Sequence, residues 1–220
     1  MSCSEGVYLI SVDSISFQYP SAGKPILDGF PARFERGEIV AVTGKNGSGK
    51  TTLTKLLAGM LRPSSGLVSI DGLDTSGMDL FEIGQRVGYV FQNPNNQLFC
   101  STVFNEVAYG LRNQGLDDAM TEAKVIHYLE FFDLSRYRDL YPGKLSHGEK
   151  QRLALAAVLA LGTGYLVLDE PTTGLDARRQ RELGELLRDL RNKLNCGIIL
   201  VSHEVDFIDR FADRELVMAR

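Results

Sequence analysis

A glycine-rich segment carries the strongest chemical signal in this 220-residue sequence. Residues 44–51 run Gly-Lys-Asn-Gly-Ser-Gly-Lys-Thr and match the phosphate-loop pattern G-x-x-x-x-G-K-[ST]. Glycines let the backbone turn tightly with its N–H groups aimed inward at phosphate oxygens, and the positive end of the following helix adds to this attraction. We therefore predict a nucleoside triphosphate site, with contacts from Gly44, Lys45, Asn46, Gly47, Ser48, Gly49, Lys50, Thr51 and Thr52.

The groups predicted to bind the phosphates, Mg²⁺ and the attacking water include a pair of adjacent carboxylates. In such a site Lys50 reaches the β- and γ-phosphates, and the Thr51 hydroxyl is a ligand for Mg²⁺. Asp169 and Glu170 directly follow an apolar run, and ligands of parallel sheets bind outside the carboxyl ends of the strands. Asp169 is then placed to hold Mg²⁺ through water, and Glu170 to accept a proton from an attacking water or to orient it. The alternative for this pair is a solvated turn.

Two further positions have a double interpretation. His203 follows another apolar run and is a candidate contact of the γ-phosphate, or a surface or capping histidine. Ser146 and Glu149 fit the capping box S-x-x-E, in which each side chain satisfies a free N–H of a helix. A serine and a glycine at an exposed helix N-terminus also form an anion site. Both interpretations hold if the anion comes from outside this chain.

The elements that must position these residues follow from hydrophobic patterning. Short β-branched runs alternate with helical patterns, which predicts a parallel sheet. Four runs are apolar without alternation, as strands buried on both faces are: Ile39–Thr43, Val87–Phe91, Tyr165–Leu168 and Ile198–Val201. Two patchier segments, Leu9–Tyr19 and Val68–Gly72, suit a smaller antiparallel edge.

Helical periodicity marks the segments between these strands. We predict helices at Thr52–Leu61, Val103–Leu111, Thr121–Phe132, Gln151–Leu161 and Arg178–Leu194. No buried strand is predicted from Asn93 to Leu145, so this region is interpreted as a helical insertion in an α/β core.

Composition narrows the class of protein. The chain is 44% hydrophobic and 24% charged, which excludes wholesale disorder. Its net charge of -4 gives no electrostatic footprint for nucleic acid. No apolar run is long enough to span a membrane, and the first residues lack the pattern of a secretory signal. We expect one globular domain without a membrane segment or signal peptide of its own.

The order of these motifs resembles the nucleotide-binding subunit of ABC transporters. In chain order the matching residues are the phosphate loop 44–51, Gln92, the signature Leu145–Glu149, Asp169-Glu170, Gly174-Leu175-Asp176 and His203. The resemblance implies an α/β P-loop NTPase of ABC type, with a RecA-like parallel-sheet core, an antiparallel β edge and an inserted helical subdomain. Residues 1–220 would form this single domain, with 1–92 and 155–220 as the core and 93–154 as the helical subdomain.

The resemblance also implies roles for individual residues. Tyr19 would stack on adenine, although Tyr19 and Phe17 are also interpretable as core aromatics on one strand face. Gln92 would contact Mg²⁺ and the attacking water, acting in catalysis with Lys50, Glu170 and His203. A second nucleotide-binding subunit, the same chain or a related one, would pair head to tail with this one. The residues facing the ATP of that second subunit would be Ser146, Gly148, Glu149 and Asp176.

A finer resemblance points to the ATPases of energy-coupling factor transporters, which import vitamins or cobalt and nickel. It rests on Phe91–Phe99 and Thr102–Gly110. It implies a transmembrane partner contacted through residues 92–112, and a peripheral location on the cytoplasmic face of the cell membrane. Two residues depart from the usual signature Leu-Ser-Gly-Gly-Gln, because His147 and Glu149 replace the first glycine and the glutamine. Members of that group usually continue beyond the position of Arg220.

Other classes of ABC ATPase are the alternatives. Another transporter type, including exporters, fits the same motifs. The type that acts on DNA inserts long coiled coils between phosphate loop and signature, and no extended heptads lie there in this sequence. A nucleotide-switched binding module without turnover is a third class, but Gln92, Glu170 and His203 together favour hydrolysis.

Overall fold

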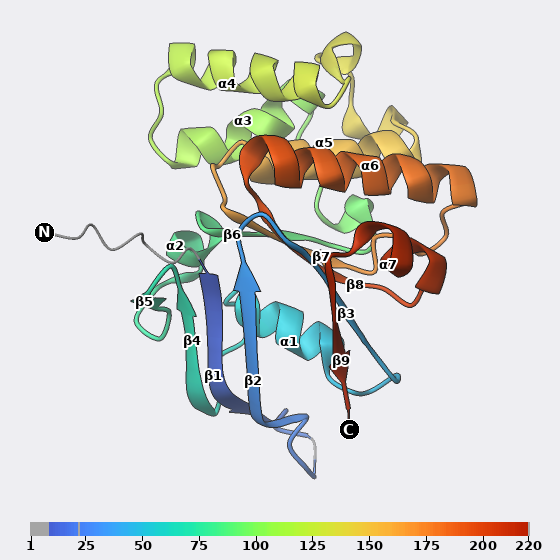
Figure 1. Cartoon of the computed structure of the whole chain (residues 1–220). Helices are drawn as coiled ribbons and strands as arrows, with labels where there is room; N and C mark the ends of the chain where they lie inside the picture. The colour runs from blue at the N-terminus through green and yellow to red at the C-terminus, as the bar shows by residue number, and fades with distance from the viewer. Residues whose placement is uncertain (1–8, 22, 220) are drawn as a thin grey trace, which may run out of the picture.

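The computed structural model describes residues 9–21 and 23–219, and in this part of the chain the strands form two sheets (Figure 1). The antiparallel sheet has the order β2-β1-β4-β5, from β1 (Leu9–Phe17), β2 (Leu27–Glu35), β4 (Ser65–Ile70) and β5 (Leu73–Asp74). The other sheet has the order β6-β7-β8-β3-β9 and is parallel throughout. Its strands are β3 (Ile39–Gly44), β6 (Val87–Val90), β7 (Tyr165–Asp169), β8 (Gly197–Val201) and β9 (Arg214–Met218).

The helices lie on both faces of the parallel sheet. They are α1 (Lys50–Leu57), α2 (Leu80–Gly84), α3 (Val103–Asn113), α4 (Asp118–Phe131), α5 (His147–Leu159), α6 (Ala177–Leu194) and α7 (Val205–Phe211). Short 3₁₀ turns are η1 (Pro94–Asn96), η2 (Ser135–Tyr137) and η3 (Pro142–Lys144). In Figure 1, α1 lies between the two sheets, and α3 to α6 lie on the other side of the parallel sheet. None of the described helices has the length and apolar character needed to cross a bilayer.

Alternate residues of the parallel strands enter two different cores. Val40 and Val42 of β3 pack into the core shared with α1 and the antiparallel sheet. Ile39 and Ala41 pack into the core formed with α3 to α7. Both faces of this sheet are therefore covered, which explains why the strand sequences are continuously apolar. The predicted parallel core with an antiparallel edge is confirmed.

Helix ends differ from the sequence predictions where backbone or capping chemistry intervenes. The helix predicted at Thr52–Leu61 begins at Lys50 and ends at Leu57, because Gly59 takes a left-handed conformation with φ +71°. The helix predicted from Gln151 begins four residues earlier, behind its Ser146 cap. The first strand ends at Phe17, so Tyr19 lies beyond it rather than on the same strand face.

Only helices and turns fill the described chain between β6 and β7. Within it α3 packs against both α4 and α5. The boundary expected between residues 154 and 155 falls inside α5, which also contacts β6 of the sheet. The division into a core and a helical subdomain 93–154 remains a proposal.

Candidate nucleotide site

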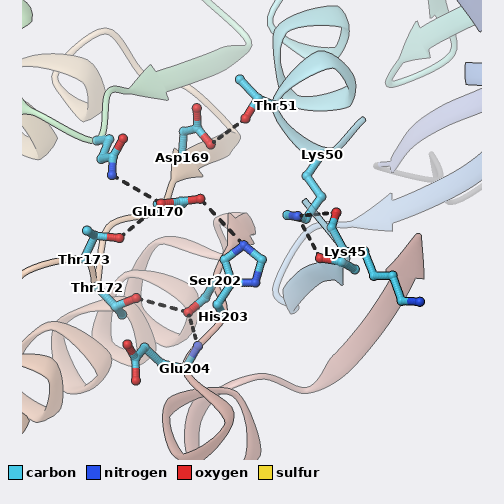
Figure 2. A network of polar contacts seen from close by, with 12 residues as sticks. Lys45, Lys50, Thr51, Asp169, Glu170, Thr172, Thr173, Ser202, His203 and Glu204 are labelled. Carbon is cyan, nitrogen blue, oxygen red and sulfur yellow. Dashed lines mark hydrogen bonds and ion pairs between the residues drawn. The ribbon is translucent and has the colours of Figure 1, made fainter. Parts of the chain in front are cut away.

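The strand order brings the residues predicted to form the nucleotide site to one edge of the parallel sheet. The phosphate loop follows β3, Gln92 follows β6, Asp169 ends β7, and His203 follows β8. Because these strands run parallel, their carboxyl ends meet at the same edge. Figure 2 shows the resulting cluster, with side chains from the β7 and β8 ends pointing toward one another near the phosphate loop.

The phosphate loop requires its glycines and is wrapped around Lys50. Gly44, Gly47 and Gly49 have φ angles of +138°, +81° and +97°, which disfavour residues with a side chain. A Cβ atom on Gly44 would lie 2.5 Å from the Met218 carbonyl oxygen. The Lys50 ammonium donates to the carbonyl oxygens of Gly44 at 2.8 Å and Lys45 at 3.1 Å (Figure 2).

This loop fits a phosphate ligand. The Ser48 hydroxyl is buried and has no hydrogen-bond partner among the described residues. The first turn of α1 begins at Lys50, so unpaired N–H groups of the helix start point toward the loop. Lysine, backbone amides and an unpaired buried hydroxyl form the donor set that phosphate oxygens accept.

Thr51 and Asp169 meet between α1 and β7. The Thr51 Oγ1 atom lies 3.4 Å from Asp169 Oδ1, and the Tyr89 hydroxyl donates to Asp169 Oδ2 at 3.1 Å. Burial raises the pKa of Asp169, and the hydrogen bond from Tyr89 opposes that rise. Tyr89 did not emerge from the sequence, since a tyrosine inside an apolar strand resembles ordinary core.

The oxygen donors of this pair fit Mg²⁺. A hydroxyl and a carboxylate are hard oxygen ligands, and Mg²⁺ usually binds through one or two protein ligands together with waters and substrate phosphates. In the described part of the chain no cluster of three or more His, Cys, Asp or Glu side chains forms an all-protein metal cage.

Glu170 is surrounded by polar side chains from three chain segments. Its Oε2 atom accepts from Gln92 Nε2 at 3.2 Å and from Thr173 Oγ1 at 3.2 Å. His203 Nε2 lies 3.7 Å from Oε1 (Figure 2). Glu170 also has a φ of +50°, a left-handed conformation that costs a non-glycine residue about 1 kcal/mol or more. Strain of this kind clusters at functional sites, and no sequence pattern revealed it.

A buried hydroxyl pair joins the loops after β7 and β8. Thr172 Oγ1 and Ser202 Oγ are 3.1 Å apart, and the Ser202 hydroxyl accepts from the Glu204 backbone N–H at 3.2 Å. These contacts fix the loop of Glu170 relative to that of His203. Thr172, Thr173 and Ser202 were not singled out by the sequence, because their importance depends on β7 and β8 being neighbours.

Tyr19 lies beside the start of α1. Its hydroxyl is 3.3 Å from the Thr52 hydroxyl, and its ring packs edge to face on Phe17 with centroids 4.9 Å apart. The ring is half-buried, so part of it remains open to solvent.

The predicted signature residues form a second location, the N-terminal tip of α5 (Ser146–Glu149). The capping box is confirmed: Ser146 Oγ accepts from the Glu149 N–H, and Glu149 Oε2 accepts from the Ser146 N–H at 2.8 Å. Glu149 Oε1 accepts from the Tyr137 hydroxyl at 2.5 Å. The Tyr137 bond and the cap lower the pKa of Glu149 to about 2. Both oxygens of this carboxylate are therefore engaged within the chain.

A cavity of about 550 Å³ lies beside this tip, between α4, α5 and α6. Gly148 and Leu175 line it, and Asp176 caps α6 next to it. The Asp176 side chain accepts from the Arg179 N–H at 2.9 Å, and this bond lowers the pKa of Asp176. In the described chain the hydrogen bonds of the tip do not reach the phosphate loop, so Ser146, Gly148 and Asp176 do not complete the site of their own chain.

Comparison with known proteins agrees with this geometry. Residues 27–173 match the family described as ABC transporter. A Pyrococcus furiosus protein, named provisionally as an ABC transporter ATP-binding protein, is 44% identical over 96% of this chain and 80% of its own length. The energy-coupling factor transporter ATP-binding protein EcfA of Methanothermobacter thermautotrophicus is 43% identical over 96% of this chain and 68% of its own.

A solved structure extends the likeness to three dimensions. The structure of cbiO1 from Clostridium perfringens has a TM-score of 0.88 and 34% sequence identity, covering 96% of this chain and 85% of that one. That protein is described as part of the ABC transporter complex cbiONQ. Some relatives are much longer: the chain spans only 37% of a Vibrio vulnificus relative that is 38% identical to it.

Proposed function

The chain belongs to the ABC transporter family as an ATP-binding subunit that hydrolyses ATP, and on this premise we propose that it powers uptake by a transporter of the energy-coupling factor type. The likeness to EcfA and to cbiO1 supports this finer assignment. The proposed solutes are those of that class, vitamins or cobalt and nickel ions.

The surroundings of Glu170 are the observation that carries the proposed chemistry. Its carboxylate faces the edge of the sheet beside the phosphate loop, so it is the group placed to take a proton from a water attacking the γ-phosphate. Gln92 and His203 hold that carboxylate and the water, and Lys50 turns to the β- and γ-phosphates. Mg²⁺ would be held by Thr51, by Gln92 and, through water, by Asp169. When bound, it neutralises charge that develops on the phosphate oxygens.

The tip of α5 is proposed to act on a second subunit. Its serine hydroxyl and glycine backbone lie at an exposed helix N-terminus, which favours an anion, and they do not serve the phosphate loop of their own chain. In a head-to-tail pair, Ser146 and Gly148 would contact the γ-phosphate of ATP held by the other subunit, with Asp176 at the seam. Glu149 would belong to this site by shaping the tip, since both its oxygens are already occupied.

Exposed aromatic side chains support a membrane partner on residues 92–112. Phe99 is 66% exposed and Tyr109 is 50% exposed, and their rings pack edge to face with centroids 5.0 Å apart. Exposed aromatic pairs of this kind are typical of protein contacts. A transmembrane subunit docked here would place the chain peripherally on the cytoplasmic face of the cell membrane.

The test is capture of the partner together with uptake. Affinity-tagged chain, purified from membranes in mild detergent, is expected to bring a polytopic membrane protein. Membrane vesicles loaded with ATP and Mg²⁺ should then take up radiolabelled cobalt, nickel or vitamin. Phe99→Asp should abolish capture and uptake while ATP binding stays unchanged. Met120→Asp, which changes another exposed apolar residue, on α4 (55% exposed), should leave capture intact. Capture of an exporter would contradict the assignment to uptake.

A further inference from the structure

Tyr89 is a buried polar side chain at the metal end of the site that the proposed mechanism does not use. It lies in β6, is 8% exposed, and pairs in register with Val167 of β7. Side chains of a strand alternate between faces, so Tyr89, Val167 and Asp169 share the face that looks toward α1. The Tyr89 hydroxyl reaches the carboxylate at the end of the neighbouring strand.

Each carboxylate oxygen of Asp169 faces a different hydroxyl group. Oδ2 accepts from Tyr89 at 3.1 Å, and Oδ1 faces the Thr51 hydroxyl at 3.4 Å. On the α1 side, the buried Thr54 hydroxyl donates to the Thr51 carbonyl oxygen at 3.0 Å. The Tyr89 ring packs edge to face on Phe91, with centroids 5.0 Å apart. Tyr89 is thus fixed by its burial, by packing on Phe91 and by its hydrogen bond to Asp169.

We propose that Tyr89 is a positioning residue for the metal-binding carboxylate. By occupying Oδ2, it sets the rotation of the Asp169 side chain so that Oδ1 faces Thr51 and the water shell of Mg²⁺. This inference rests on the proposed function, since it assumes that Thr51 and Asp169 hold Mg²⁺ with ATP. Without the hydroxyl the carboxylate is free to turn, and a buried oxygen loses its partner. Groups that orient metal ligands in this way typically change metal affinity about tenfold or more when removed.

Tyr89→Phe tests this, because it keeps the ring and its packing and deletes only the hydroxyl. The chain offers a matched control in Tyr165→Phe. Tyr165 is a fully buried tyrosine at the opposite end of β7, whose hydroxyl donates to the Asp71 carboxylate at 2.7 Å. Both variants lose one hydrogen bond between a tyrosine and a carboxylate, but only Tyr89 touches Asp169.

The readout is metal affinity, measured in a Glu170→Gln background so that no ATP is consumed. Mn²⁺ replaces Mg²⁺, and its binding to the protein–ATP complex is followed by electron paramagnetic resonance. Tyr89→Phe is expected to weaken Mn²⁺ binding about tenfold. ATP affinity in EDTA should be unchanged, and Tyr165→Phe should bind Mn²⁺ like its parent.

Each other outcome counts against a distinct claim. Equal Mn²⁺ affinity in Tyr89→Phe and its parent overturns the positioning role. Equal weakening by Tyr89→Phe and Tyr165→Phe also overturns it, since the effect would then be general. A parent protein whose ATP affinity does not depend on the metal defeats the proposed metal site itself. If Tyr89→Phe does not fold, Tyr89→Met, which fills the space with a flexible apolar side chain, is measured in the same way and by the same criteria.

Discussion

Replacement of Glu170 by glutamine is the most direct test of the proposed catalytic base. Both donors on the carboxylate, Gln92 Nε2 and Thr173 Oγ1, meet the same atom, Oε2. A glutamine side chain that keeps its carbonyl oxygen at this position retains both hydrogen bonds. Its NH₂ group then takes the place of Oε1 and faces His203, which lies 3.7 Å away. The substitution therefore removes the ability to accept a proton and little else.

The expected loss can be stated as a free energy. General base catalysis contributes roughly 10²- to 10⁴-fold to a rate. Since each tenfold change is about 1.4 kcal/mol, the barrier should rise by about 3 to 5 kcal/mol. ATP affinity should stay within about twofold of wild type, because the phosphate loop does not contact Glu170. The left-handed backbone at this position is equally available to glutamine, so the melting temperature should not move.

Phosphate release under saturating Mg²⁺ and ATP gives the turnover, and calorimetric titration gives ATP affinity. Glu204→Gln is the matched control, because it neutralises an exposed carboxylate one residue beyond His203 that caps no helix N–H with its side chain. It should hydrolyse ATP at the wild-type rate. Turnover in Glu170→Gln clearly above about a hundredth of wild type would refute the assignment of the base, whose predicted loss is at least about 10²-fold.

Two further predictions concern the elements that support the site. Tyr137→Phe removes the donor that helps lower the pKa of Glu149 to about 2 from its usual 4.5. A lowered carboxyl pKa stabilises the fold above pH 4.5, and this stabilisation is lost as the pH falls toward 2. The variant's loss of unfolding free energy, measured by urea unfolding, should therefore be largest at neutral pH and shrink below pH 4.5. A loss that does not depend on pH would contradict this prediction. Gly88→Ala would place a Cβ atom 2.0 Å from Val158 Cγ1 and should cost about 1–3 kcal/mol. Calorimetry should show that the melting temperature falls by about 2–4 °C per kcal/mol of lost stability. Part of this loss should be recovered when Val158 is also changed to alanine. An equal loss from Gly88→Ala in the wild type and in Val158→Ala would contradict the proposed contact.

The features that could be predicted from the sequence are those set by residues near one another in the chain. The phosphate loop, the cap of α5 and the four buried strands depend on residues close together in the chain. Gly44, for example, is predictable because a motif and a left-handed turn demand the same residue. Likewise Ser146 and Glu149 are three residues apart, so their mutual cap needs no tertiary information.

Two elements were not predicted, because their residues show no clear local pattern. Strand β2 contains Gly29 and Pro31 and buries few of its residues, which is tolerated because it lies at the edge of its sheet. Helix α2 spans only Leu80–Gly84, too short for a helical period to show. In the structure a capping box from Asp79 and Glu82 starts this helix.

The contacts inside the site depend on strand order, which no local rule supplies. Tyr89 reaches Asp169 only because β6 pairs with β7, although 80 positions separate the two residues. Ser202 supports the loop of Glu170 only because β8 is the next strand along. The residue types at the carboxyl ends of strands therefore identify the chemistry. Supporting side chains on neighbouring strands and loops hold these groups in place, and only the folded sheet brings those side chains into contact.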